Sequence, residues 1–270
     1  MLLSNATWLP IPPTDTSAWV YYSLVIAAVI VMGIAKSGFG GGVGILAVPL
    51  IANAMPADRA LGVMLPILIV ADVFAVHQHR GQWSWPHMRP ALLGAAIGIG
   101  LGTLLYFLLQ AGSKDNLEAQ LSLFVGSICL LMVAVQVYRL CGGKVPKLPG
   151  NKPTAITAGA AAGFTSMLAH AAGPIMSIYW LDQKMGKRVL TGSLVFFFIL
   201  VNLAKLPSYA KLEMITAGSL KESAFFAVFV PIGSLLGIVM HHRIPEKPFT
   251  AVMYAGAAVA GGWLIVKVIV

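Results

Sequence analysis

Two breaks in long apolar runs carry residues that could bind an anion. The first break, SGFGGGVG at 37–44, follows Lys36, and the second, HAAGP at 170–174, begins with His170. Glycine allows a ligand to approach the backbone closely. A helix that starts at such a break points its free N–H groups and the positive end of its dipole at that ligand. Because a lysine stands beside one break and a histidine beside the other, we interpret the two breaks as an anion site.

The glycines also have a purely structural interpretation. Small residues let membrane helices pack closely, and motifs of this kind recur without any ligand. The break occurs twice in the chain, however, and each copy has a polar side chain beside it. These two features favour binding over packing.

Three further polar residues interrupt apolar runs and are candidates for function. Asp72 lies in LPILIVADVFAVHQH, and Asn202 and Lys205 lie in FFFILVNLAKLPSY. Ionisable groups inside a membrane are functional candidates by default, although Lys205 could instead extend to the membrane interface. For Asp72 the favoured interpretation is a structural partner of Lys36, Lys205 or a histidine, and the alternative is a proton-coupling carboxylate.

The composition explains why these few polar residues stand out. Of the 270 residues, 58% are hydrophobic and only 10% are charged, whereas soluble domains carry about 25% charged residues. The mean hydropathy is +0.85, and several apolar runs reach the ~20 residues that cross a bilayer. The sequence therefore predicts an all-α polytopic membrane protein. Its net charge of +9 is explained by basic cytoplasmic loops, so no nucleic-acid partner is expected.

Neither the cysteines nor the histidines form a recognisable metal motif. Cys129 and Cys141 lie on one predicted helix, too far apart to form a disulfide. No two of the six histidines have metal-ligand spacing on a recognisable scaffold. We therefore expect no metal site and no cofactor.

Apolar runs between polar breaks predict ten segments. Two of them, 43–55 and 173–182, are short for a full crossing, and each follows one of the two breaks. The ten predicted segments are 19–36, 43–55, 60–77, 90–110, 118–138, 154–169, 173–182, 189–207, 219–240 and 249–269.

The basic residues predict the orientation of the chain. With the N-terminus outside, 12 of the 18 Lys and Arg residues lie on the cytoplasmic side, as the positive-inside rule requires. The basic loop 139–152 decides the orientation, and the stretch before Lys36, which contains no Lys or Arg, agrees with it.

The two halves of the chain resemble each other. With a shift of 129, KSGFGGGVGILAV (36–48) aligns with TSMLAHAAGPIMS (165–177), so that Ser37 meets Ser166 and Gly44 meets Gly173. Each half then contains a broken helix or helical hairpin followed by three transmembrane helices. Each half is predicted to cross the membrane an odd number of times. The two repeats therefore insert with opposite orientations, which is a hallmark of secondary transporters. The predicted organisation is one integral membrane domain, with repeats at 1–138 and 154–270 and a cytoplasmic linker at 139–153.

Four blocks of sequence resemble the TauE/SafE family of sulfite/organosulfonate exporter-like (TSUP) permeases. They are KSGFGGGVGILAVPL, LPILIVADVFAV, AGFTSMLAHAAGPIMSIYWL and FFFILVNLAKLPSYA, and their order covers about residues 22–269. The resemblance implies a duplicated membrane carrier of small anions, typically sulfur-containing ones such as sulfite, sulfoacetate or other sulfonates.

The same resemblance nominates residues that bind the substrate. One departure is Ala172, which stands where many members have a glycine and narrows the room for a ligand at the second break. The residues nominated are Lys36, Ser37, Gly40, Gly41, Gly42, His170, Gly173, Pro174, Asn202 and Lys205.

These observations lead to a secondary transporter for a small anion in the bacterial cytoplasmic membrane. It would work by alternating access, with membrane lipids around it and a proton or sodium ion as the coupling partner. The protein could also assemble as a homodimer. An anion channel with the same pore is the first alternative. An intramembrane enzyme ranks last, because HExxH, GxSxG and paired intramembrane carboxylates are absent from the sequence.

The predicted orientation can be tested with tags in intact cells. We expect a tag in the 139–153 loop to be protected from membrane-impermeant reagents, and a tag at the N-terminus to react with them, because basic loops stay in the cytoplasm. A protected N-terminus would contradict the inverted arrangement of the two halves.

Overall fold

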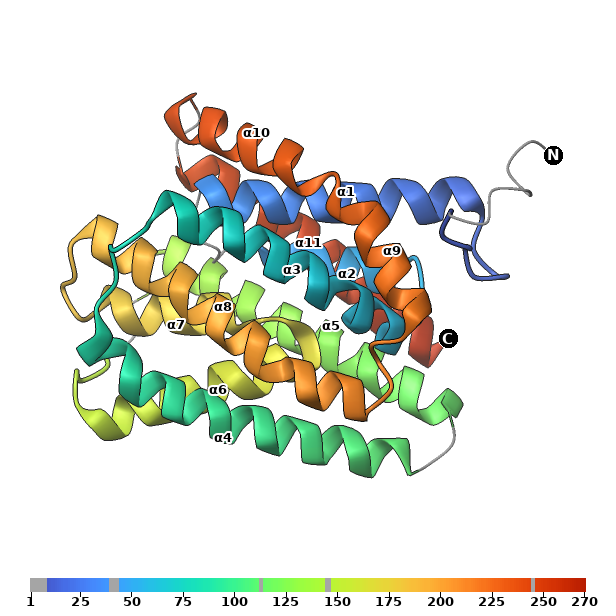
Figure 1. Ribbon diagram of the computed structural model, residues 1–270, viewed down its shortest axis with the longest axis horizontal. Coiled ribbons are helices and arrows are strands. Elements are labelled where there is room, and N and C mark those ends of the chain that lie inside the picture. Colours follow the sequence, from blue (N-terminus) through green and yellow to red (C-terminus); the bar gives the residue numbers. More distant parts are fainter. Residues whose placement is uncertain (1–8, 39–43, 112–113, 144–146, 244–245) are drawn as a thin grey trace.

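The computed structural model describes residues 9–38, 44–111, 114–143, 147–243 and 246–270, and all of its regular elements are helical. The helices lie side by side in one bundle (Figure 1). The first half contains α1 (Ala18–Gly38), the 3-10 turn η1 (Gly44–Leu46), α2 (Ala47–Ala52), α3 (Ala57–Gln78), α4 (Trp85–Gln110) and α5 (Lys114–Leu140). The second half contains α6 (Lys152–Ala169), α7 (Ala172–Leu181), α8 (Lys187–Lys211), α9 (Ala217–Ala227), α10 (Val230–Arg243) and α11 (Glu246–Ile269).

The lengths and compositions of these helices are those of a multi-pass membrane protein. Within the described residues six helices are long and apolar enough to cross a membrane, or seven if the bent pair α9 and α10 is one span. The six are α1, α3, α4, α5, α8 and α11. On α4 the large apolar side chains of Leu101, Leu104, Phe107 and Leu108 are exposed. A bilayer is the solvent in which such a surface is stable.

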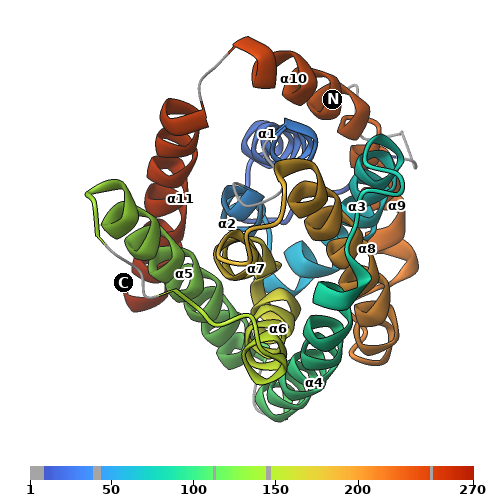
Figure 2. The same cartoon turned by 90° about the vertical axis from the view of Figure 1, so that its left-hand side faces the viewer.

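The two short segments remain short as helices. α2 has six residues and α7 has ten, which at ~1.5 Å per residue is less than the ~30 Å of a bilayer core. Each follows a longer helix, α1 or α6, at the predicted break. Figure 2 shows α2 and α7 inside a ring formed by the longer helices.

One predicted segment is wrong in detail. Residues 219–240 were expected to form a single apolar helix, but the chain bends by 41° between α9 and α10. Pro231 lies at the start of α10 and has no N–H to donate to the carbonyl of Ala227. The first helix therefore ends at Ala227, and a second one begins with the proline in its first turn.

Glycines allow α4 and α6 to pack backbone against backbone. A Cβ on Gly94 would overlap the carbonyl oxygen of Ile156, and one on Gly98 would overlap that of Ala160. The two glycines are four residues apart and face the same partner, which is the small-residue spacing of close membrane helix pairs. Gly94 and Gly98 are therefore packing contacts between α4 and α6.

The most extensive helix contacts join a helix of the first half to a helix of the second half. α4 of the first half packs on α6, the first helix of the second half, and α10 of the second half packs on α1. α5 packs on α11, and α3 packs on α8. In each of these two pairs, the helices occupy the same position in the order of their halves when α9 and α10 are counted as one bent span. This pattern is the one expected of two halves related by a twofold axis. The inverted repeat itself stays a prediction.

α3 and α8 pack against each other in antiparallel directions. Gly62 of α3 lies against the backbone of Met214, just after α8, and Gly192 of α8 lies against the backbone of Gln82, just after α3. Asp72 follows Gly62 by ten residues, and Asn202 follows Gly192 by ten residues. Each polar residue therefore lies about 15 Å along its helix from its glycine contact.

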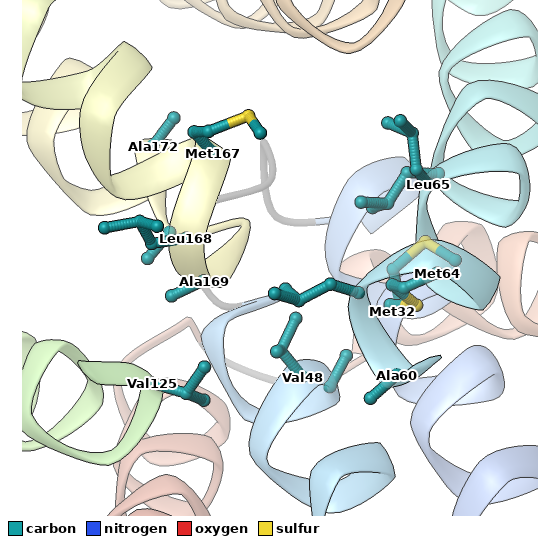
Figure 3. Close-up of a cluster of buried hydrophobic side chains, with 14 of the residues drawn as sticks. Met32, Val48, Ala60, Met64, Leu65, Val125, Met167, Leu168, Ala169 and Ala172 are labelled. Carbon is teal, nitrogen blue, oxygen red and sulfur yellow. The ribbon is translucent and has the colours of Figure 1, made fainter. Parts of the chain in front are cut away.

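A buried hydrophobic cluster packs against the first half of α3. Figure 3 shows side chains of α6 and α7 on one side and of α1 and α3 on the other, with Val48 of α2 between them. Met64 and Leu65 of α3 and Met167 and Leu168 of α6 are buried in it. The polar side chains of α3 and α8 are thus held in apolar surroundings.

The contact between α4 and α6 predicts that alanine is destabilising at one glycine of α4 and tolerated at another. Replacing Gly98 with alanine should lower the free energy of unfolding by about 1–3 kcal/mol, because the new methyl group meets a backbone carbonyl that cannot move aside. Gly100→Ala is the matched control, since no atom lies within 4 Å of a Cβ at that position. Thermal unfolding of both variants in detergent measures the effect. Equal melting temperatures would contradict the close packing of α4 on α6.

Candidate functional site

The centre of the candidate site is a carboxylate held between α3 and α8. Asp72 is 1% exposed and Asn202 is 5% exposed. The Asn202 side-chain amide donates to Asp72 Oδ2 at 2.6 Å. The two residues are 130 positions apart in the sequence, and only the packing of the two helices brings them together.

Lys36 of α1 completes the first cluster. Its ammonium group forms an ion pair with Asp72 Oδ1 and has a longer contact of 3.5 Å with the carbonyl oxygen of Leu68. It also lies 6.0 Å from the centre of the Phe198 ring. Lys36 stands in the last turn of α1, where the helix dipole favours a cation. The structure therefore pairs Asp72 with Lys36, one of the three partners that the sequence suggested for it.

Lys205 of α8 forms a second cluster with the end of α6. Its side chain is fully buried, so the alternative that it extends to the membrane interface is wrong. The ammonium group donates to the carbonyl oxygen of Ser166 at 3.1 Å and to the Ser166 hydroxyl at 3.0 Å. Its third contact is His170 Nδ1 at 2.7 Å. One turn further along α8, the Tyr209 hydroxyl donates to the carbonyl oxygen of Met167 at 2.9 Å.

His170 ends α6 and turns its ring toward α3 and α8. Its backbone is left-handed, with φ of 49°, a conformation that histidine adopts more readily than most residues. Because Nδ1 accepts from Lys205, the hydrogen-bond network assigns the ring proton to Nε2, which donates to the carbonyl oxygen of Leu61 at 3.2 Å. His170 is thus a neutral imidazole that orients Lys205.

The two clusters together carry an excess of positive charge. In their ordinary ionised forms, two ammonium groups (Lys36 and Lys205) and one carboxylate (Asp72) leave a net charge of +1. In the described part of the chain, no carboxylate forms a salt bridge with Lys205. The charges of Lys36 and Asp72 both act on Lys205. In these forms the three side chains carry one positive charge in excess within the buried site.

The other predicted site residues lie around the two breaks. The Ser37 hydroxyl is buried, and it has no hydrogen-bond partner among the described residues. Gly173 and Pro174 are buried in the first turn of α7, directly after His170. The predicted Gly40, Gly41 and Gly42 lie outside the described residues.

Three groups of the site were missed by the sequence interpretation. Ser166 holds Lys205, the Leu61 carbonyl orients His170, and Tyr209 ties α8 to α6. Ser166 could have been predicted from the sequence, because it aligns with the candidate site residue Ser37 in the internal repeat. A backbone carbonyl leaves no trace in the sequence, and a tyrosine in an apolar run is ordinary.

A cavity of about 320 Å³ lies elsewhere, at the start of α3. It contains none of the predicted site residues. Arg59 and Glu222 form an ion pair there between α3 and α9, and Arg59 also donates to the carbonyl oxygen of Ile11. Asp58 is 14 residues from Asp72, which is about 21 Å along the helix. The lining residues are Asp58, Arg59, Glu213, Met214, Thr216, Gly218, Ser219 and Glu222.

Comparison with known proteins identifies a family. A family model described as "Sulfite exporter TauE/SafE" matches residues 25–264, a range that contains both clusters. No curated protein and no solved structure matches the chain. Members of this family are membrane transporters associated with sulfur-containing anions. Since the match covers most of the chain, and the helices have the lengths and composition of membrane spans, the protein is a multi-pass membrane protein of the sulfite exporter TauE/SafE family.

Proposed function

We propose that the protein is a secondary transporter that moves a small anion across the membrane by alternating access. The anion would be a sulfur-containing oxyanion, such as sulfite or an organosulfonate. The observation that carries this proposal is the pair of buried ammonium groups of Lys36 and Lys205. Among the described residues, Asp72 is the one carboxylate that forms a salt bridge with either of them. Family membership supports the sulfur-containing class.

The charge excess explains why the ligand would be an anion. An unpaired charge in an apolar interior is costly unless a partner compensates it. A sulfonate or sulfite group brings the missing negative charge and several oxygen acceptors at once. Lys36 contacts the Leu68 carbonyl only at 3.5 Å, beyond the usual range of a good hydrogen bond. The buried Ser37 hydroxyl is the next residue along the chain. Both groups can therefore donate to an arriving oxyanion.

In this proposal, residues of the two breaks at 37–44 and 170–174 contribute the remaining contacts with the anion. Gly173 and Pro174 form the first turn of α7 beside His170, and Gly40, Gly41 and Gly42 follow Lys36 in the sequence. In the proposed site these glycines have the role that the sequence predicted, which is to let the anion approach the backbone. Asn202 acts through Asp72, whose carboxylate it orients.

Burial of the charges favours a carrier over a channel. Lys205 is 0% exposed, Asp72 1% and Lys36 7%. Water-sized access to these groups requires a movement of the surrounding helices, and such a movement is the step that alternating access provides. An intramembrane enzyme is less well supported, since Asp72 is held by a lysine and an amide rather than by a second carboxylate.

The surroundings of the protein belong to the same proposal. We place it in the bacterial cytoplasmic membrane with the N-terminus outside, because the basic loop 139–152 predicts that orientation. Membrane lipids would contact the exposed apolar faces such as that of α4. A homodimer is compatible with these faces.

Flux measurements distinguish a carrier from a channel. In proteoliposomes we expect uptake of labelled sulfite or thiosulfate to saturate and to be accelerated by unlabelled anion inside the vesicle, because a carrier returns faster when it is loaded. Flux that rises linearly with concentration and ignores internal anion would favour the channel. Absence of any anion flux would contradict the proposed function.

Removal of the Lys205 charge should weaken anion binding. In Lys205→Met we expect the affinity for thiosulfate to fall about 10- to 150-fold, since a hydrogen bond to a charged group contributes ~1.5–3 kcal/mol. Methionine retains much of the apolar stem, so the variant is expected to fold. Lys211→Met is the matched control, because Lys211 is exposed at the end of the same helix. Affinity and melting temperature are measured on the same purified samples. Unchanged affinity in a folded Lys205→Met would contradict the role of this lysine.

A further inference from the structure

We propose that Asp72 sets the number of protons that accompany each anion. A divalent anion is carried together with one proton on Asp72, and a monovalent anion is carried without one. This inference rests on the proposed anion transport and adds the rule that couples it to protons.

The surroundings of Asp72 make it the group that can take the proton. Oδ1 is paired with Lys36 of α1, and Oδ2 accepts from Asn202 of α8. The other charge that acts on it is Lys205 of α8. His170 already uses both ring nitrogens, one toward Lys205 and one toward Leu61.

Two further carboxylates, one on α3 and one on α9, have other partners. Glu222 of α9 is paired with Arg59 near the other end of α3. Asp58 accepts from the backbone N–H of Arg59 in that same region. Within the described residues, Asp72 is thus the one carboxylate in direct contact with either lysine of the site.

The rule follows from the charge of the site. Without an anion, Lys36, Lys205 and Asp72 sum to +1. A monovalent anion brings the site to neutrality with Asp72 ionised. A divalent anion would leave one negative charge in excess, and a proton on Asp72 removes it. Since an unpaired charge is expensive in an apolar interior, the neutral combination is favoured in each case.

The geometry allows this exchange without a large rearrangement. When the anion approaches, the Lys36 ammonium can turn from Asp72 Oδ1 to the anion, because its other contact, the Leu68 carbonyl, is 3.5 Å away. A proton from water then forms an O–H bond on the freed carboxylate oxygen and leaves again when the anion is released. The Asn202 side chain serves both forms, because its NH₂ donates to Oδ2 and a carboxyl group protonated on Oδ1 still accepts there.

Proton uptake during binding tests the rule. The wild-type protein is titrated calorimetrically at pH 7 in two buffers that differ in ionisation enthalpy, with thiosulfate as divalent probe and methanesulfonate as monovalent probe. Neither probe titrates near neutral pH, so any proton taken up belongs to the protein. We expect about one proton per thiosulfate and none per methanesulfonate.

Two variants connect the proton to Asp72. Asp72→Asn keeps both ammonium groups, so thiosulfate should still bind but without proton uptake. Asp58→Asn makes the same chemical change on the same helix, about 21 Å away, and should keep the wild-type proton count. If Asp72→Asn does not fold, the comparison of the two anions on the wild-type protein remains decisive.

Several results would overturn the rule. They are equal proton uptake for both anions, no uptake with thiosulfate, and uptake that persists in Asp72→Asn. If only one anion binds, the number of protons taken up with that anion tests the rule, which requires one proton for thiosulfate and none for methanesulfonate. Binding of neither anion would instead contradict the anion site itself, and the rule would fail with it.

Discussion

A buried ammonium group without a carboxylate partner is one of the most expensive groups to keep in an apolar interior, and Lys205 is such a group in the described part of the chain. Ser166 and His170 supply acceptors for its three donors. Its three hydrogen bonds are therefore made within the protein, but its positive charge has no carboxylate partner there. In the proposed transport site, an anion would take over one of these hydrogen bonds. The break after α6 and the left-handed backbone of His170 both serve to bring these acceptors to α8. A lysine held in this way is ready for an anion.

Lys36 and Asp72 add an internal counter-charge to this excess. The carboxylate neutralises one of the two ammonium groups, so these three side chains together bury a net charge of +1 rather than +2. In the proposed mechanism an arriving anion competes with Asp72 for Lys36, which makes the carboxylate part of the binding equilibrium. The geometry thus supports the proposal of a small anionic ligand. The sulfur in that ligand comes from family membership, since ammonium and hydroxyl donors accept any oxyanion of suitable size.

Much of the fold could be predicted from local sequence. Apolar run length and the Gly- and Pro-containing breaks located most helices to within a few residues, because a bilayer selects for continuous hydrophobicity. The break before Pro231 was missed, since a proline is tolerated in the first turn of a helix and gives no separate signal there. Glycine was also ambiguous. Gly94 and Gly98 are packing contacts between α4 and α6, and their spacing in the sequence does not distinguish packing from ligand binding.

The candidate site divides in the same way between sequence and structure. Lys36, Asp72 and Asn202 were found because a polar residue in an apolar run is costly and therefore conspicuous. That Asp72 is shared between Lys36 and Asn202, and that Ser166 holds Lys205, depended on the packing of α3 against α8 and on the break after α6. Hydrophobicity is a property of each residue and can be read along the chain. The neutralisation of one charge by another depends on distances between helices, and only the tertiary structure sets those distances.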